Sequence, residues 1–217
     1  MMKKIVVVNA SPRIGFNTYK LLQASAKGAM EEGAEVKFYN LYKLDKYFGC
    51  YSCFGCKRKP NEGKCIIKDG LKEVLDAIRE SDGLIIGSPN YLGDTSAAFR
   101  ALFERLEFQT LTYNLAKPRY DFKRIPVLFL MTSNAKLDYY KNIGYDDMLN
   151  KYKTAFEDAV GNTKIYIADD TLQVNNYDLY NWTMFNKEDK IKHHNEVFDN
   201  ELNEMYSLGK EIVNMGW

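Results

Sequence analysis

Residues 5–18 read IVVVNASPRIGFNT and define the first structural unit of the chain. The four apolar β-branched residues at its start are typical of a strand that is buried on both faces of a parallel sheet. A turn rich in small and polar residues follows, and a helical spacing of apolar residues then continues from about residue 17 to 32. A buried strand, a polar turn and a helix in this order predict the opening βα unit of an α/β domain.

The same alternation of strand and helix patterns continues along the chain. Further strands are predicted at residues 36–39, 83–87, 125–131 and 164–168, and further helices at about 71–78, 99–106, 146–160 and 188–213. This pattern predicts the α/β class, with a flavodoxin-like, three-layer, doubly wound, five-stranded parallel sheet of order 2-1-3-4-5. In such a sheet, ligands bind beyond the carboxyl ends of the strands.

The composition excludes several classes of protein. The chain has 217 residues, and its 30 Lys+Arg against 29 Asp+Glu give a formal net charge of +1, which argues against nucleic-acid binding through bulk basicity. No apolar stretch approaches the ~18 residues of a membrane span. The apolar run behind the N-terminal lysines ends at Val8, which is short for a signal peptide. We therefore expect a cytoplasmic protein that binds neither a membrane nor nucleic acid.

Two segments lie outside the strand and helix pattern. Residues 43–68 form a Cys-rich insertion, and connections of this length are usually functional or disordered. Residues 171–215 combine an aromatic segment, which ends at about residue 186, with the last helix. We expect the aromatic segment to cover the sheet edge or a neighbouring subunit, with a substrate lid as the alternative. The predicted organisation is one domain over residues 1–217 that carries these two additions, because a single core keeps growing up to about 250 residues.

Three predicted loops meet at the carboxyl edge of the sheet. The first, residues 9–18, combines hydroxyl and amide side chains with Arg13 at a helix N-terminus, which favours a phosphate. It matches neither the G-x-G-x-x-G nor the Walker pattern, so a dinucleotide fingerprint is absent. The second, residues 87–94, holds a proline between two glycines, which stiffens the turn and lets backbone approach a flat ligand. With the small polar residues 132–134, these loops predict a phosphate-tailed aromatic cofactor.

The four cysteines of the chain all lie between residues 50 and 65. Cys50, Cys53 and Cys56 are separated by two residues each, and eight residues separate Cys56 from Cys65. A disulfide scaffold would spread its cysteines along a small secreted chain, so this grouping indicates metal or redox chemistry. A 4Fe-4S cluster takes four thiolates with such spacings, zinc takes the same ligands, and metal-free thiols or one redox-active pair are the third interpretation. We favour the cluster, because the loop leaves the same sheet edge as the cofactor loops.

Two motifs resemble a known family. Ser11-Pro12-Arg13 followed by Asn17-Thr18, and Gly87-Ser88-Pro89-x-Tyr91-x-Gly93, are similar to sequences of the NAD(P)H-dependent FMN reductases and related flavodoxin-like flavoproteins. The Cys-rich loop before the second helix resembles the iron-sulfur flavoproteins of anaerobes. The resemblance covers roughly residues 3–107. It departs from the family at Phe16, where many relatives carry Ser, and in the gap before Cys65, which is longer than theirs.

The resemblance implies that FMN lies against the three loops. It assigns the phosphate to the first loop and the isoalloxazine ring to the second, with the third loop on the other side of the ring. The implied FMN contacts are Ser11, Arg13, Asn17, Thr18, Ser88, Pro89, Asn90, Tyr91, Leu92, Gly93, Thr132, Ser133 and Asn134. The resemblance also implies a homodimer or homotetramer.

Together, the residues and the resemblance predict an FMN-dependent oxidoreductase. It would take electrons from NADH, NADPH or a protein donor and pass them through FMN, with a 4Fe-4S cluster as a second centre, to a small-molecule or protein acceptor. Because the flavin carries the chemistry, we assign no catalytic side chain. The alternatives are a flavodoxin-type one-electron carrier, which the balanced charge disfavours, and a non-enzymatic four-cysteine metal or redox sensor. The triplet Lys57-Arg58-Lys59 is expected to be a solvated loop tip, or else to attract an acidic electron-transfer partner.

Overall fold

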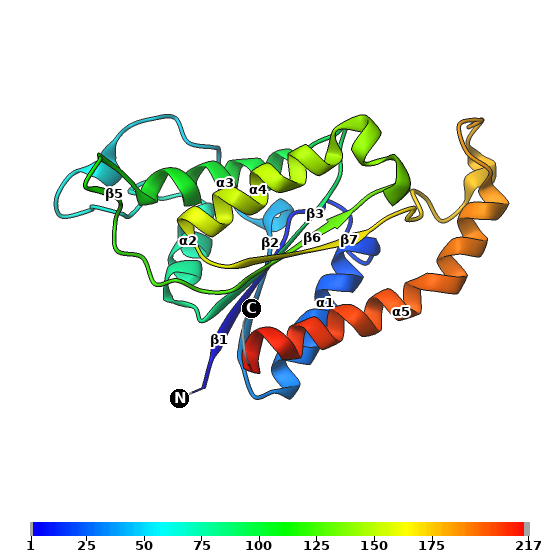
Figure 1. Ribbon diagram of the computed structural model, residues 1–217, viewed down its shortest axis with the longest axis horizontal. Coiled ribbons are helices and arrows are strands. Elements are labelled where there is room, and N and C mark those ends of the chain that lie inside the picture. Colours follow the sequence, from blue (N-terminus) through cyan, green and yellow to red (C-terminus); the bar gives the residue numbers. More distant parts are fainter. Residues whose placement is uncertain (1, 215–217) are drawn as a thin grey trace.

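The computed structural model describes residues 2–214, with a five-stranded sheet at the centre of the molecule (Figure 1). The strands of this sheet are β1 (Lys4–Asn9), β2 (Glu35–Asn40), β3 (Gly83–Pro89), β6 (Val127–Thr132) and β7 (Thr163–Ala168). They lie in the order β2-β1-β3-β6-β7, and each neighbouring pair is parallel. Because β4 and β5 belong to a separate hairpin, this order is the predicted 2-1-3-4-5 order, and the predicted fold class is confirmed.

Helices cover both faces of the sheet and complete three layers (Figure 1). One face carries two helices, and the other carries three. The first two are α1 (Asn17–Glu31) and α5 (Lys187–Asn214), and the other three are α2 (Leu71–Glu80), α3 (Ala97–Thr110) and α4 (Tyr145–Ala159). Within residues 2–214, no helix combines the length and the apolar character that a membrane span requires.

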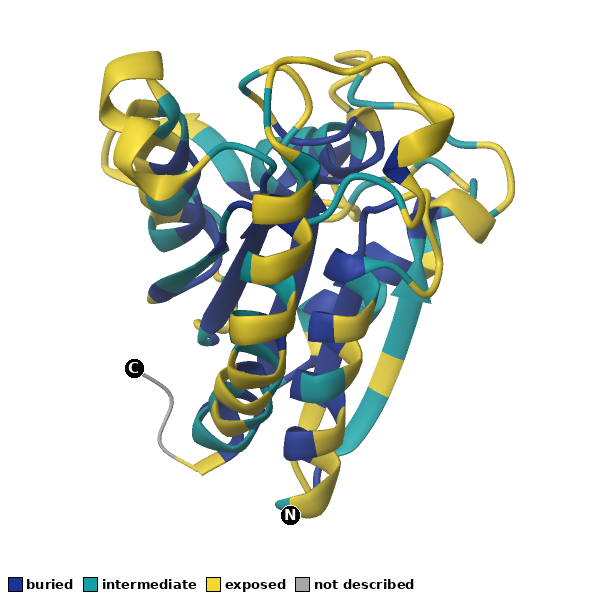
Figure 2. Cartoon of the chain, turned by 90° about the vertical axis from the view of Figure 1, so that its right-hand side faces the viewer, coloured by how far each residue is buried: buried dark blue, intermediate teal, exposed yellow. Residues whose placement is uncertain are grey.

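The sheet separates two hydrophobic cores. Val6 and Val8 of β1 pack with the core under α2, α3 and α4, whereas Ile5 and Val7 pack with the core under α1 and α5. This alternation follows from the pleat of a strand, and both faces are buried because helices cover both. Figure 2 shows the buried strands between helices whose outward faces are exposed.

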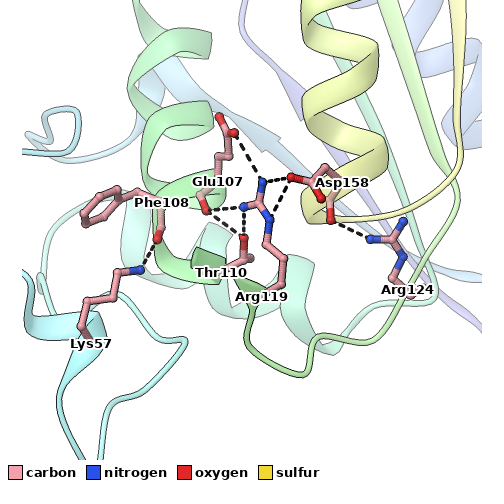
Figure 3. Close-up of polar contacts among 7 residues, drawn as sticks. All are labelled: Lys57, Glu107, Phe108, Thr110, Arg119, Arg124 and Asp158. Atoms are coloured by element: carbon pink, nitrogen blue, oxygen red, sulfur yellow. Dashed lines mark hydrogen bonds and ion pairs between the residues drawn. The ribbon is translucent and has the colours of Figure 1, made fainter. Parts of the chain in front are cut away.

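A two-stranded hairpin between α3 and β6 was not predicted from the sequence. It consists of β4 (Leu111–Asn114) and β5 (Lys117–Arg119), which pair antiparallel. Arg119 stabilises it: the guanidinium donates to the Thr110 hydroxyl over 2.6 Å and to Asp158 Oδ2 of α4 over 3.0 Å (Figure 3). Strands this short and exposed carry little periodicity, so tertiary contacts of this kind decide whether they form.

Two glycines allow α5 to pack closely against α1. A Cβ atom at Gly209 would lie 1.9 Å from the Ser25 carbonyl oxygen, and one at Gly28 would lie 2.0 Å from the Tyr206 carbonyl oxygen. Only glycine permits such an approach of two helix backbones. The contact fixes the position of α1, whose N-terminus lies at the carboxyl edge of the sheet. From this contact, α5 extends until its N-terminal end projects beyond the sheet (Figure 1).

Candidate functional site

The loop after β1 leads directly into an uncapped helix N-terminus. Asn9, the last residue of β1, accepts from Ser11 N over 3.1 Å and donates to Asn40 Oδ1 of β2 over 3.0 Å, which turns the chain across the sheet edge. The helix α1 begins at Asn17 after an extended Phe16, and no side chain caps it. The first N–H groups of a helix have no partner within the helix, so an uncapped terminus suits an anion.

A cavity of about 220 Å³ lies at this helix terminus. All four residues predicted to hold a phosphate line it, namely Ser11, Arg13, Asn17 and Thr18. Thr18 Oγ1 lies 2.7 Å from Thr132 Oγ1, which ties the first loop to the end of β6. The Arg13 guanidinium lies 4.0 Å from the centre of the Phe16 ring. Phe16 therefore holds the Arg13 guanidinium at the cavity.

The segment after β7 closes this cavity and was not assigned to the site from the sequence. Asn17 Nδ2 donates to the Leu172 carbonyl oxygen over 2.7 Å, and Arg13 donates to the carbonyl oxygen of Gln173. Thr171, Leu172 and Gln173 all line the cavity. The sequence does contain one indication that these residues belong to the site: residues 171–173 follow the carboxyl end of the fifth strand of the sheet.

The loop after β3 forms a tight turn at the mouth of the site. Tyr91 and Asp94 exchange backbone hydrogen bonds of 2.7 and 3.2 Å, and the two residues between them, Leu92 and Gly93, have φ of 55° and 87°. Two central residues with positive φ are typical of a type I′ turn. The side chain of Leu92 is completely exposed at the tip.

Asp94 anchors this turn to α4. Its Oδ1 accepts from Tyr152 Oη over 2.6 Å and from Thr95 N over 2.7 Å. Burial acts to raise the pKa of Asp94, but these two hydrogen bonds, together with the charges of Arg100 and Lys151, lower it overall. The carboxylate is therefore the stable form, and it fixes the base of the turn.

Some of the residues predicted in this loop line a cavity, and the others only stabilise the turn. Pro89, Asn90 and Tyr91 line the cavity described above, whereas Leu92 lines a second cavity beside it. Ser88 lines neither, because its buried hydroxyl accepts from Ser96 N over 2.9 Å and donates to the Pro89 carbonyl oxygen. Gly93 lines neither and serves the turn.

The second cavity has a volume of about 610 Å³ and adjoins the first. Ser133 and Asn134 of the third predicted loop line it, and Thr132 lines the smaller cavity. A buried ion pair supports this loop: Lys190 of α5 donates to the Asn134 carbonyl oxygen over 2.8 Å and pairs with Asp170. Burial lowers the pKa of Lys190, and Asp170 offsets part of that effect.

Three amide side chains lie where the two cavities adjoin. Asn90, Asn134 and Gln173 line both of them. Each has a buried polar atom that finds no partner within residues 2–214, namely Asn90 Nδ2, Asn134 Oδ1 and Gln173 Oε1. Buried polar atoms in folded proteins are almost always paired, so unpaired donors and acceptors around a cavity indicate a polar ligand. A ring with hydrogen-bonding edges and a phosphate tail fits this arrangement.

The aromatic segment borders the same cavities. Tyr180 stacks on Trp182 with ring centres 4.3 Å apart, and Tyr177 and Phe185 pack edge-on against Trp182 at 6.1 and 5.8 Å. Phe185 also lines the larger cavity. Phe185 and residues 171–173 thus border the cavities, whereas most of the aromatic segment is exposed beside the projecting end of α5 (Figure 1).

The four cysteines line a separate cavity beside α3. Cys50, Cys53, Cys56 and Cys65 all contribute to it, and all four are free thiols. The eight-residue gap folds back on itself, because Gly63 N donates to the Cys56 carbonyl oxygen over 2.9 Å. The longer gap thus still brings Cys65 to the cavity that the other three cysteines line. Burial raises the pKa of the Cys56 thiol, and Lys57 opposes this in part.

Side chains of α3 hold the cysteine loop, and sequence reasoning assigned none of them to a site. Glu104 accepts from Cys50 N over 3.3 Å, and Gln109 accepts from Cys65 N over 3.0 Å. Lys57 donates to the carbonyl oxygens of Phe108 and, over 2.6 Å, of Leu111; Figure 3 shows its contact with Phe108. Lys57 is therefore an anchor of the loop.

The parallel sheet, with helices on both faces and two adjoining cavities at its carboxyl edge, defines a flavodoxin-like α/β protein. The profile of the family described as NADPH-dependent FMN reductase matches residues 3–138, and the chain belongs to this family. The family resemblance found in the sequence motifs is thereby confirmed.

Curated relatives match about half of the chain. An iron-sulfur flavoprotein of Methanocaldococcus jannaschii is 38% identical over 102 residues, which are 47% of this chain and 51% of that protein. An iron-sulfur flavoprotein of Methanosarcina thermophila is 31% identical over 102 residues, with the same coverage. The chain thus spans about half the length of the curated relatives that it matches.

Solved structures of low sequence identity share the whole fold. An NAD(P)H:quinone oxidoreductase from Methanothermobacter marburgensis superposes with a TM-score of 0.67 at 13% identity, over 97% of each chain. An azoreductase from Bacillus anthracis gives a TM-score of 0.69 at 14% identity, over 97% of this chain and 100% of that one. At these identities the likeness shows the fold alone.

Proposed function

We propose that the chain is an oxidoreductase that binds FMN at the carboxyl edge of its sheet and uses NADH or NADPH as electron donor. The observation that supports this most is the set of unpartnered atoms on Asn90, Asn134 and Gln173 where the two cavities adjoin. FMN joins an anionic tail to a flat ring with donor and acceptor edges. It therefore matches a small polar cavity that opens into a wider one, in a chain of the FMN reductase family.

The smaller cavity is proposed to hold the FMN phosphate. The uncapped N-terminus of α1 would donate backbone N–H groups, and the hydroxyls of Ser11 and Thr18 would add to them. Asn17 and Arg13 already bind the carbonyl oxygens of residues 172 and 173, so they would join this segment to the bound phosphate. The segment then excludes water from the phosphate site.

The larger cavity is proposed to hold the isoalloxazine ring and the nicotinamide donor. Asn90, Asn134 and Gln173 would orient the polar edge of the ring, and Tyr91 and Leu92 would flank its flat face. When bound, FMN accepts a hydride from the nicotinamide and releases electrons singly or in pairs. No side chain of the chain needs to act as acid or base.

The four cysteines are proposed to hold a 4Fe-4S cluster. Within the described part of the chain, no three His, Cys, Asp or Glu side chains lie close enough to share one ion, although all four cysteines line one cavity. The proposal is supported by the four thiols that line this one cavity and by the likeness to relatives described as iron-sulfur flavoproteins.

We further propose that residues 1–217 form one domain, which assembles into a homodimer or homotetramer through the rim of the FMN edge. Leu92, Met184 and Leu179 expose 105%, 91% and 74% of their reference areas. Leu92 and Met184 line the larger cavity, and apolar side chains gathered around a site mark an interaction surface. The electron acceptor would be a small molecule or a protein that reaches this rim.

Anaerobic stopped-flow mixing of FMN-loaded protein with NADH and with NADPH tests the proposed function. The flavin absorbance near ~450 nm should bleach in a reaction that saturates with the nicotinamide concentration. FMN-loaded protein that neither nucleotide reduces would contradict the enzyme and favour a carrier.

A further inference from the structure

Arg105 is a cationic side chain on the buried face of α3. It is 1% exposed and pairs with Asp69: its Nη1 lies 2.8 and 2.7 Å from the two carboxylate oxygens. Nη1 also contacts the Phe48 carbonyl oxygen at 3.4 Å, and Nη2 contacts the Ile67 carbonyl oxygen at 3.3 Å. A guanidinium supplies five N–H donors in a rigid plane, so it can hold several acceptors at once.

The residues that Arg105 contacts lie on both sides of the cysteine loop in the sequence. Phe48 lies two residues before Cys50, and Ile67 lies two residues after Cys65. Asp69 also accepts from Leu71 N over 3.1 Å, which joins the loop to the start of α2. A single side chain thus fixes both ends of the segment that carries all four thiols.

One donor of Arg105 remains unused. Its Nε is buried and has no partner in hydrogen-bond geometry within residues 2–214, although Nη1 and Nη2 are bonded, and the guanidinium as a whole interacts with the Cys65 thiol. The same side chain lines the cavity that the four cysteines surround. An unpaired buried N–H costs free energy, and it costs more on a charged group. An acceptor inside the cysteine cavity would remove that cost.

We infer that Arg105 is the positioning residue of the four-cysteine centre: it clamps both ends of the loop and donates its Nε–H to a sulfur of the bound cluster. This inference rests on the 4Fe-4S cluster proposed above. Hydrogen bonds to sulfur and nearby positive charge set the reduction potentials of such clusters. One-electron reduction adds a negative charge, so the arginine stabilises the reduced state and raises the midpoint potential.

Arg119 provides a matched control. Its guanidinium also joins α3 to neighbouring segments, through Thr110 and Asp158, but it does not line the cysteine cavity (Figure 3). Substitution of Arg119 removes a comparable structural clamp without removing a donor from the cavity. A purely structural role for Arg105 predicts the same midpoint potential in both variants.

The test is a dithionite titration of cluster-reconstituted protein, with iron content and midpoint potential measured on each sample. Arg105→Lys keeps the charge but loses the Nε–H, and Arg105→Met/Asp69→Asn removes the ion pair without leaving a buried carboxylate unpaired. We expect a more negative potential in Arg105→Lys, a larger shift in the double variant, and the wild-type potential in Arg119→Lys. Selective loss of iron from the Arg105 variants would also support the clamp.

Two results would overturn the inference, and they are distinguishable. If both Arg105 variants bind wild-type amounts of iron at the wild-type potential, Arg105 has no such role, and the proposed cluster stands. If wild-type protein binds no iron on anaerobic reconstitution, the proposed cluster fails, and the inference fails with it.

Discussion

The two candidate sites of this molecule are built in different ways. The carboxyl-edge cavities use loops that directly continue β1, β3, β6 and β7, so the topology of the sheet brings their residues together. The cysteine cavity lies beside α3, and four side chains hold its loop there, namely Lys57, Glu104, Arg105 and Gln109. The first site therefore depends on the whole fold, and the second depends on a few contacts from one helix. Changes to one site should leave the other intact.

The largest expected effect comes from Cys56→Ser. Cys56 is buried in the cysteine cavity, and a serine hydroxyl is a poor iron ligand. The iron content of anaerobically prepared protein should fall from about four atoms per chain to nearly none. The FMN content should stay the same, and Ser52→Gly, in the same loop, should change neither. If FMN were lost together with the iron, the claim that the two sites are independent would be contradicted.

Gly209→Ala should give the largest loss of stability. The new methyl group would lie 1.9 Å from the Ser25 carbonyl oxygen, so α1 and α5 must move apart. We expect the free energy of unfolding to fall by about 2 kcal/mol, after the gain in helix propensity from alanine. FMN affinity should also fall, because the N-terminus of α1 borders the cavity proposed to hold the phosphate. Urea unfolding measures the change, with Ser207→Ala on the exposed side of α5 as control. A variant that is as stable as wild type would contradict the close contact.

Glu201 gives the carboxyl-edge region a pH dependence. Burial, Asp169 and Glu204 together raise its pKa to about 7. The unfolded chain loses this proton near pH 4.5, whereas the folded protein keeps it up to about 7, so stability falls as the pH rises through this range. Glu201→Gln should therefore be more stable than wild type at pH 8, by roughly 2 kcal/mol, and equal to it below pH 4.5. Unfolding curves at both pH values measure this, and Glu196→Gln, at an exposed position, should show no such difference.

Two glutamine substitutions give the smallest effects and the sharpest comparison. Gln173→Ala removes an amide from the junction of the two cavities, and Gln109→Ala removes the acceptor of Cys65 N. We expect Gln173→Ala to weaken FMN binding about 5- to 10-fold, as one hydrogen bond predicts. Gln109→Ala should speed iron loss to a chelator by a similar factor. If each variant changes both sites equally, the sites are not built independently.

The sheet could be predicted from the sequence because its physical signals are local. Buried parallel strands are continuous apolar runs, such as Val127–Thr132, and the helix at 17–31 follows a polar turn. The grouping of the first-loop residues was predictable for the same reason, since these residues are adjacent in sequence. All four of its predicted phosphate contacts line one cavity.

Contacts between distant segments could not be predicted in this way. Gln173 reaches the site because its carbonyl oxygen accepts from Arg13, a partner 160 residues away. Ser88 is predicted from the sequence to touch the cofactor, and a hydrogen bond that the sequence does not reveal turns its hydroxyl to the start of α3, where it accepts from Ser96 N. The sequence does contain one indication that Arg105 is buried: this charged residue stands directly before Leu106, on the apolar face of α3.

The most direct test of the account is to measure FMN and iron on one sample of protein purified without oxygen. The account predicts one FMN and about four irons per chain, with flavin absorbance near ~450 nm above a broad cluster absorbance. A colourless protein that takes up no FMN when the cofactor is supplied would contradict the central claim.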